Sequence, residues 1–208
     1  MFFFRSPDFC RTRWMGMSTG TIPDGSITSS SGLRNSVPVL ALVLILNVVF
    51  RSLDFCRTRR MGMSTRVIPD DSVTSATPYD HRFVAANGRF GTNRSWLARS
   101  MNMDAVWLKV DLGQESRVYG VITQGRPDYG QWARTYKLSF SMDGGNWTTY
   151  ADTDGSDKLF QGNYDRSSPV YNFLDSPVTT RHVQFHPRTY QSRPVMRVEV
   201  LGCPTELL

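Results

Sequence analysis

The chain has 208 residues, 40% of them hydrophobic and 20% charged, and its 24 Lys and Arg against 18 Asp and Glu give a formal net charge of +6. This excess of positive charge favours acidic partners such as anionic lipid headgroups, sulfated glycans or acidic proteins. The sequence shows no run of Lys and Arg, no zinc-finger or helix-turn-helix signal, and no Gly-x-Ser-x-Gly, His-Glu-x-x-His or phosphate-loop motif, so we expect neither a nucleic-acid partner nor an enzyme.

The N-terminal quarter contains an internal repeat. Residues 5–31 recur as residues 51–77 at an offset of 46, and both copies contain Asp-Phe-Cys-Arg-Thr-Arg, Met-Gly-Met-Ser-Thr and Ile-Pro-Asp. A repeated structural unit normally brings the whole unit with it, but no domain body follows the first copy. One copy is therefore redundant, because only one can begin the domain that follows.

Between the copies lies a nearly all-aliphatic segment, residues 37–50. It is short for a membrane-spanning helix of about 20 residues. As a signal peptide it starts too far from Met1, and Arg51 follows it without a small-residue cleavage site. We interpret residues 1–50 as a largely disordered or loosely helical extension without function, produced by a duplicated exon joined through translated non-coding sequence or by a mis-set start. A membrane anchor is the alternative.

After the second copy, short apolar segments alternate with Gly, Pro, Asp and Asn clusters and show the two-residue period of β-strands. Residues 107–113 begin this series, and residues 119–122 are apolar on both faces, as expected of a central strand. In residues 136–141, Tyr, Leu and Phe alternate with Lys and Ser. The Asp-Gly-Gly-Asn sequence of residues 143–146 then predicts a hairpin turn.

Two later segments show the same alternation. In residues 182–186 Val and Phe alternate with His and Gln, and in residues 196–200 Met and Val alternate with Arg and Glu. We expect each strand to have one buried face and one wet face. Several such strands, without any long stretch of 3.6-residue period, predict an all-β sandwich or jelly roll.

Taken together, these segments resemble the discoidin domain, also called the coagulation factor 5/8 type C domain. The resemblance is carried, in family order, by Ile68 to Ser75, Ile122 to Gly125, Tyr136 to Ser141, Asp143 to Trp147 and Phe160 to Asn163. It covers residues 56–203 and implies an all-β, discoidin-type jelly-roll β-sandwich or barrel. We therefore place the domain at residues 51–205 and the N-terminal extension at residues 1–50.

The resemblance also implies a disulfide bond. Cys56 and Cys203 stand where the family places the cysteine pair that ties its two ends together, and chain entropy would credit such a bond with at most about 5 kcal/mol. It indicates an oxidising, extracellular compartment. Cys10 is then left over, free or paired to another chain. Cys10 is also the rival partner of Cys203, because its copy, with Gly20 and Thr28-Ser29-Ser30, resembles the family more; we favour Cys56 because its copy is contiguous with the body.

In this fold, ligands meet loops at one end of the barrel, because rigid strands present variable loops at little ordering cost. Tyr, Phe and Arg in such loops offer large rigid area and charge-assisted hydrogen bonds. The residues that we expect to bind ligand come from two loops and are Tyr79, His81, Arg82, Phe83, Arg126, Asp128 and Tyr129. A third loop, residues 188–193, is a candidate that adds none to this set.

Several of these residues have a structural alternative. Phe83 would then fold back onto the rim of the core, and Arg82 and Arg126 would be solvated surface charges. Trp132 matches a family position that enters a strand, so we expect it to be structural. Tyr190 matches a position that packs the last loop.

We expect no metal, cofactor or catalytic residue. The three histidines, His81, His182 and His186, lack metal-ligand spacing, since the last two share a strand face without a third ligand. Sugar-binding relatives suggest one alternative, a calcium site at residues 87–92 with Glu199.

The resemblance implies a non-enzymatic, extracellular recognition module that binds a cell-surface or matrix glycan, glycosaminoglycan or protein in cell adhesion. Sequons at Asn93 and Asn146 fit a secreted glycoprotein. The alternative is peripheral binding to anionic phospholipid membranes, where relatives insert bulky apolar loop tips backed by basic residues. Here Phe83 and Tyr129 stand among charged residues, which favours a polar ligand. An accessory module of a hydrolase is a third class.

Overall fold

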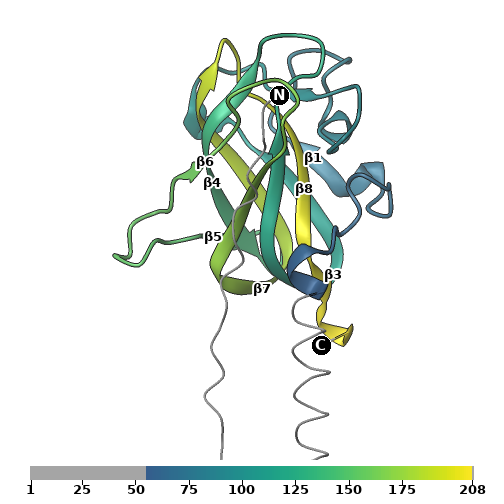
Figure 1. The fold of residues 1–208 in the computed structure, drawn as a ribbon, viewed down its shortest axis with the longest axis vertical. Coiled ribbons are helices and arrows are strands. Elements are labelled where there is room, and N and C mark those ends of the chain that lie inside the picture. Colours follow the sequence, from purple (N-terminus) through teal and green to yellow (C-terminus); the bar gives the residue numbers. More distant parts are fainter. Residues whose placement is uncertain (1–54, 208) are drawn as a thin grey trace, which may run out of the picture. The chain divides into compact units, whose positions relative to one another are not determined.

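A computed structural model describes residues 55–207 (Figure 1), so the expectations for residues 1–50, including the repeat copy at 5–31 and the apolar segment at 37–50, lie outside the described residues. After a helical turn at residues 55–58, the strands are β1 Val73–Ser75, β2 Trp96–Leu97, β3 Leu108–Gln124, β4 Trp132–Ser141, β5 Thr148–Thr149, β6 Phe160–Gln161, β7 Val170–Gln191 and β8 Val195–Pro204. Short 3₁₀ helices lie between or after them: η1 Asp70–Ser72, η2 Ala85–Asn87, η3 Met103–Ala105 and η4 Thr205–Leu207. Within the described part of the chain, no helix has the length and apolar character needed to cross a membrane.

The strands form one antiparallel sheet in the order β2-β8-β3-β7-β4-β5, with β1 added to β3 and β6 added to β4. The long strands β3 and β7 run beside each other through the middle of the sheet (Figure 1). The register between them shifts between Asp111 and Ser116 and again between Val118 and Gly120. Such bulges increase strand twist and bend a sheet. The sheet therefore curls on itself, and the predicted all-β sandwich or barrel is confirmed.

The predicted strands bury the apolar faces that their patterns indicate. Residues 119–122 lie in β3 between β7 and β8, and all four are buried, as expected of a central strand. The apolar side chains of residues 136–141 lie in the core, where the Tyr136 ring stacks on Phe160 with centroids 5.6 Å apart. Trp132 begins β4 half-buried, as its structural assignment predicts.

The opposite faces of these strands are not wet, which corrects the sequence-based expectation. The buried polar residues on them are Ser139, Ser141, His182, Gln184, Arg197 and Glu199. Loops and short strands cover these side chains. The guanidinium of Arg197 donates to three backbone carbonyl oxygens, and the hydroxyl groups of Ser139 and Thr149 lie 3.1 Å apart across β4 and β5. Hydrogen-bond partners satisfy Ser139, Ser141, Arg197 and Glu199, whereas His182 Nδ1 has none within the described residues.

The predicted hairpin turn joins β4 to β5. Asp143 Oδ1 accepts the backbone N–H groups of Gly145 and Asn146, each at 2.8 Å. Gly144 has φ +75°, a left-handed conformation that glycine adopts without strain. The hydrogen bonds from Asn146 and Gly145 hold the pKa of the Asp143 carboxyl well below its usual value. Asn146, the second predicted glycosylation site, is exposed on this turn.

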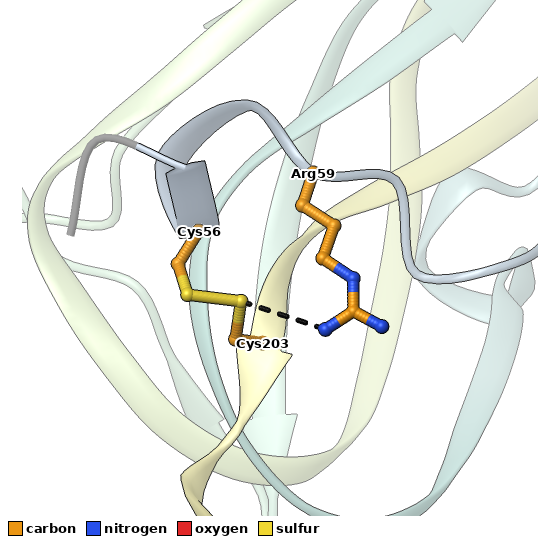
Figure 2. The surroundings of a disulfide bond; sticks show 3 residues. All are labelled: Cys56, Arg59 and Cys203. Atoms are coloured by element: carbon orange, nitrogen blue, oxygen red, sulfur yellow. Dashed lines mark hydrogen bonds between the residues drawn. A yellow bond between two sulfur atoms is a disulfide. The ribbon is translucent and has the colours of Figure 1, made fainter. Parts of the chain in front are cut away.

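A disulfide bond joins Cys56 to Cys203, as the family resemblance implies, so Cys56 rather than Cys10 holds Cys203. Their Cα atoms lie 5.2 Å apart and both residues are buried. Figure 2 shows Arg59 beside the bond, with Nη1 3.8 Å from Cys203 Sγ. The bond closes a sequence separation of 147 residues. Tying so long a loop contributes at most about 5 kcal/mol in the chain-entropy model.

The opening segment, defined as residues 55–75, is held on the barrel by a buried carboxylate. Glu199 is 0% exposed. Its Oε1 accepts the backbone N–H groups of Gly62 and Met63 at 3.2 and 2.9 Å. Its Oε2 accepts the backbone N–H and the hydroxyl of Ser64 at 2.8 and 2.7 Å. A buried charge is stable only when it is satisfied in this way.

A buried cation holds the same segment from the other side. Arg89 is 1% exposed and donates from Nη1 to the carbonyl oxygen of Met63 at 3.1 Å. Its Nε and Nη2 donate to Asp70 Oδ1 at 3.0 and 2.6 Å. Just after Asp70, β1 pairs with β3, Val73 lying opposite Val110. The opening segment is thus anchored by a disulfide, two charged side chains and a strand.

Candidate functional site

An open cleft of about 440 Å³ lies between the loop from β1 to β2 and the loop from β3 to β4. Its lining residues are His81, Arg82, Phe83, Asn93, Arg94, Ser95, Arg126 and Asp128. Five of the seven residues predicted to bind ligand therefore line a single cleft, although they come from two loops far apart in the sequence. The other two do not line it but contact residues that do, Tyr79 contacting Phe83 and Tyr129 contacting Arg126.

An ion pair fixes the first loop. Asp80 Oδ1 accepts the backbone N–H of Arg82 at 2.8 Å, and the guanidinium donates from Nε and Nη2 to the two carboxylate oxygens at 3.2 and 2.8 Å. These hydrogen bonds from Arg82 lower the pKa of Asp80 to about 2, so the pair stays charged at neutral pH. The backbone N–H of Phe83 donates to the Asp80 carbonyl at 3.1 Å, which closes the turn. The loop thus presents Phe83 half-buried and His81 exposed.

Arg126 organises the second loop. Its Nε and Nη2 donate to the two carboxylate oxygens of Asp128 at 2.7 and 3.0 Å, and Nη1 donates to Gln131 Oε1 at 3.0 Å. Its guanidinium also lies 4.6 Å from the centroid of the Phe83 ring and 5.5 Å from that of Tyr129. The side chain is only 18% exposed, so the solvated-charge alternative for Arg126 does not describe it. The hydrogen bonds from Arg126 lower the pKa of Asp128.

Stacking continues beyond the cleft in an arginine–aromatic strip, defined as Tyr129, Arg126, Phe83, Tyr79 and Arg193. The Phe83 and Tyr79 rings meet edge to face with centroids 6.2 Å apart. The guanidinium of Arg193 lies 4.9 Å from the Tyr79 centroid. Tyr79 and Tyr129 are 39% and 58% exposed, so the strip offers aromatic surface to a partner. Contacts between guanidinium groups and aromatic faces contribute about 0.5–2 kcal/mol each, which makes the strip rigid.

The third candidate loop is shorter than expected. β7 continues through Tyr190 to Gln191, which pairs with Trp132, so most of residues 188–193 is strand. The tip of this hairpin lies at Ser192, with φ +61°, and at Arg193. Arg193 was not selected from the sequence, because nothing local indicated that this tip reaches Tyr79.

Three cleft residues were also not selected: Asn93, Arg94 and Ser95. Arg94 is exposed, and among the described residues its side chain has no ion pair or hydrogen bond, in contrast to Arg82 and Arg126. Ser95 is 2% exposed, and its hydroxyl has no hydrogen-bond partner within the described residues. The cleft therefore offers a ligand one uncompensated positive charge. In the sequence, residues 93–95 stand out as a sequon, which predicts glycosylation and gives no indication of a ligand-binding cleft.

Residues 55–207 contain no cluster of three or more His, Cys, Asp or Glu side chains placed to bind a metal ion. The calcium alternative at residues 87–92 does not fit, because both carboxylate oxygens of Glu199 accept hydrogen bonds from residues 62–64. Burial lowers the pKa of His182, and it lowers that of His186 to about 4, so both are neutral at pH 7.

A smaller cavity of about 270 Å³ lies near the disulfide end of β8. Met61, Ile68, Leu112 and Pro204 are among its lining residues. The seven residues predicted to bind ligand all lie in the described part of the chain, and none of them lines this cavity.

Comparisons with known proteins agree with this architecture. A family model described as the F5/8 type C domain matches residues 71–200. Lactadherin of Sus scrofa is 40% identical over 124 residues, which is 58% of this chain and 30% of that protein, and coagulation factor VIII of Sus scrofa is 37% identical over 118 residues, 56% of this chain and 5% of that protein. Recombinant discoidin II of Dictyostelium discoideum matches in structure with a TM-score of 0.57 and 25% identity, covering 64% of this chain and 55% of that one. The chain thus spans less than a third of these two curated relatives.

Proposed function

The chain belongs to the F5/8 type C (discoidin) domain family, and from this membership we propose that it is a non-enzymatic, extracellular recognition module for a negatively charged cell-surface or matrix glycan. Members of this family bind ligands through the loops at one end of the barrel. The observation that carries the choice of ligand is the cleft itself, where Arg94 lies uncompensated beside the stacked pair of Arg126 and Phe83.

The chemistry of the cleft suits a sulfated or carboxylated sugar. An anionic group would accept charge-assisted hydrogen bonds from Arg94, whose guanidinium is not engaged by another described side chain. The apolar face of a sugar ring would lie against Phe83 or Tyr129. Arg82 and Arg126 are already held by Asp80 and Asp128, so they shape the cleft more than they add charge.

Several features support an extracellular setting. The Cys56–Cys203 disulfide is the kind of bond that persists in oxidising compartments. Both sequons, at Asn93 and Asn146, have exposed asparagines. Asn93 lines the cleft, so a glycan attached there would lie at the binding surface.

The proposal is tested by binding of a sulfated heparin-derived oligosaccharide, measured by isothermal titration calorimetry. Arg94→Ala should weaken binding about tenfold or more, since a hydrogen bond to a charged group contributes about 1.5–3 kcal/mol. The matched control is Arg117→Ala, which removes the same charge. Arg117 is exposed on β3 opposite Cys203, at the other end of the barrel. Equal loss in both variants, or no binding by the wild type, would contradict the proposal.

Peripheral binding to anionic phospholipid is the second candidate. It is favoured by the exposed side chains along the same rim, Tyr79, Val84, Met101 and Tyr129. Co-sedimentation with vesicles that contain or lack phosphatidylserine separates the two functions. Strong, phosphatidylserine-dependent binding that Phe83→Ala abolishes would favour the membrane over the glycan.

A further inference from the structure

The site on the barrel that holds the opening segment is matched by two stretches of this chain. Residues 5–31 repeat residues 51–77, and the structure shows which side chains of the second copy the barrel contacts. We propose that residues 5–31 can occupy this site in place of residues 51–77 of the same chain, with Cys10 then bonded to Cys203. The site would accordingly have two alternative occupants.

The buried positions of the opening segment are nearly identical in the two copies. Those of the second copy are Cys56, Gly62, Met63, Ile68 and Val73. At the corresponding positions the first copy has Cys10, Gly16, Met17, Ile22 and Ile27. The last pair differs by a single methylene group at a core position, a small change in volume that partial repacking of the core can absorb.

The two charged side chains that anchor the opening segment would meet the same groups in either copy. Glu199 accepts hydrogen bonds from residues 62–64, and Arg89 donates to the carboxylate of residue 70. The pairs of matching residues are Gly62 with Gly16, Met63 with Met17, Ser64 with Ser18 and Asp70 with Asp24. The glycine is required, since a Cβ at Gly62 would lie 2.7 Å from the Val67 Cβ.

At two positions where the copies differ, the first fits the described conformation better. Arg66 has φ +63°, a left-handed conformation that strains every residue with a Cβ, and the first copy has Gly20 there. Val67 is 76% exposed, and the first copy has the polar Thr21 at that position. The exception is Arg60, whose guanidinium lies 4.8 Å from the centroid of the Phe90 ring and which Trp14 replaces in the first copy. One exposed contact of this kind is no larger than the strain at Arg66 and does not explain why the second copy occupies the site.

Connectivity explains it. Residues 51–77 run directly into the rest of the domain, whereas docking of residues 5–31 would close an additional loop of 46 residues. Loop closure disfavours that arrangement on the order of 300-fold, and relief of the strain at Arg66 offsets about 5- to 30-fold of this. We expect the second copy to prevail by roughly 10- to 60-fold.

The change of bond needs no external oxidant. The Cys10 thiolate attacks Cys203 Sγ, the bond from Cys203 to Cys56 breaks, and Cys56 leaves as a thiolate that takes up the proton lost by Cys10. One disulfide forms as one breaks. Because Cys56 and Cys203 are buried, the attack requires residues 55–64 to leave the barrel first.

The test is Cys56→Ser in the full chain, with the disulfide located by tryptic mapping without reduction. The peptides that contain Cys10 and Cys56 differ at Pro7 and Leu53, so mass distinguishes them. The variant should remain a folded monomer with Cys10 bonded to Cys203, whereas the control Cys10→Ser should keep Cys56 bonded to Cys203. A free Cys203 thiol, or Cys203 bonded only to another chain, would overturn the proposal.

A second measurement keeps the proposal testable if Cys56→Ser does not fold. In the wild type equilibrated in glutathione redox buffer, the Cys10–Cys203 bond should form a minor fraction, roughly one part in 10 to 60. Arg66→Gly should lower that fraction about 5- to 30-fold, because it relieves the strain in the competing copy. Absence of the bond at one part in about 1,000, or no effect of Arg66→Gly, would contradict the two-occupant site.

Discussion

Replacement of Glu199 by Gln should destabilise the domain through the opening segment. The carboxylate accepts five hydrogen bonds, from the backbone of Gly62, Met63, Ser64 and Val200 and from the Ser64 hydroxyl. An amide of the same shape places an NH₂ group opposite one set of donors. With the NH₂ group at the Oε2 position, the Ser64 hydroxyl can turn to accept, but the Ser64 backbone N–H loses its acceptor.

The expected magnitude follows from these contacts. An orphaned buried N–H costs about 1–3 kcal/mol, and each remaining hydrogen bond loses about 1 kcal/mol when the acceptor is no longer charged. The loss of stability is partly offset, because the buried charge and its desolvation cost of several kcal/mol are removed as well. We expect Glu199→Gln to lower the free energy of unfolding by about 2–4 kcal/mol and the melting temperature by about 5–15 °C.

The assay is chemical and thermal unfolding followed by circular dichroism. The matched control is Glu115→Gln, since Glu115 is exposed and its side chain makes no hydrogen bond to another described residue. The control should stay within about 0.5 kcal/mol of the wild type. If Glu199→Gln were equally stable, the buried carboxylate would not be what anchors the opening segment.

Three further predictions concern pH and the cleft. Burial lowers the pKa of His186 to about 4, so between pH 7 and pH 5 the unfolded chain takes up a proton on this histidine that the folded chain does not. The wild type should therefore lose about 2 kcal/mol of stability over this range, measured by urea unfolding. His186→Gln should show a smaller loss. Because Arg82 lowers the pKa of Asp80 to about 2, the ¹³C signal of the Asp80 carboxyl carbon in NMR should titrate with a midpoint near pH 2. A midpoint at or above the usual aspartate pKa would contradict the ion pair. Arg126→Lys keeps the charge but loses the two-pronged contact with Asp128, so sulfated-oligosaccharide affinity should fall several-fold while thermal stability changes little.

The core faces of the strands could be predicted because alternation is a local signal. Tyr136 and its neighbours in β4 bury the apolar side of a two-residue pattern, and Asp143 to Asn146 form the turn that their chemistry favours. The disulfide followed from the resemblance to a family and not from spacing. Contiguity with the rest of the domain favoured Cys56 over Cys10, and the structure confirms Cys56 as the partner of Cys203.

The burial of Arg89, Arg197 and Glu199 could not be predicted, because their partners lie far along the chain. Ser64 is 135 residues from Glu199, and the carbonyl that accepts from Arg197 in the loop at Thr92 is 105 residues away. A strand pattern with Arg and Glu on one face is normally a solvated face. Only the folded chain shows that loops return to cover it and to satisfy each charge.

The candidate site was predictable in part. The family resemblance pointed to loops at one end of the barrel, and residue types selected Phe83 and Arg126 within them. The structure brings their two loops together in one cleft. Arg94 was missed because exposure and ion pairing distinguish a free guanidinium from an engaged one, and neither is a local property. Arg193 was missed because its contact with Tyr79 joins loops far apart in the sequence. The roles of these residues in binding stay predictions.

The most direct test of the account is an NMR titration of the ¹⁵N-labelled protein with a sulfated heparin-derived oligosaccharide. We predict that amide shifts gather at residues 79–83, 93–95 and 126–131, with the Arg94 signal among those that move most. Shifts confined instead to the smaller cavity near Leu112 and Pro204, or spread evenly over the basic surface, would contradict a binding site in the cleft.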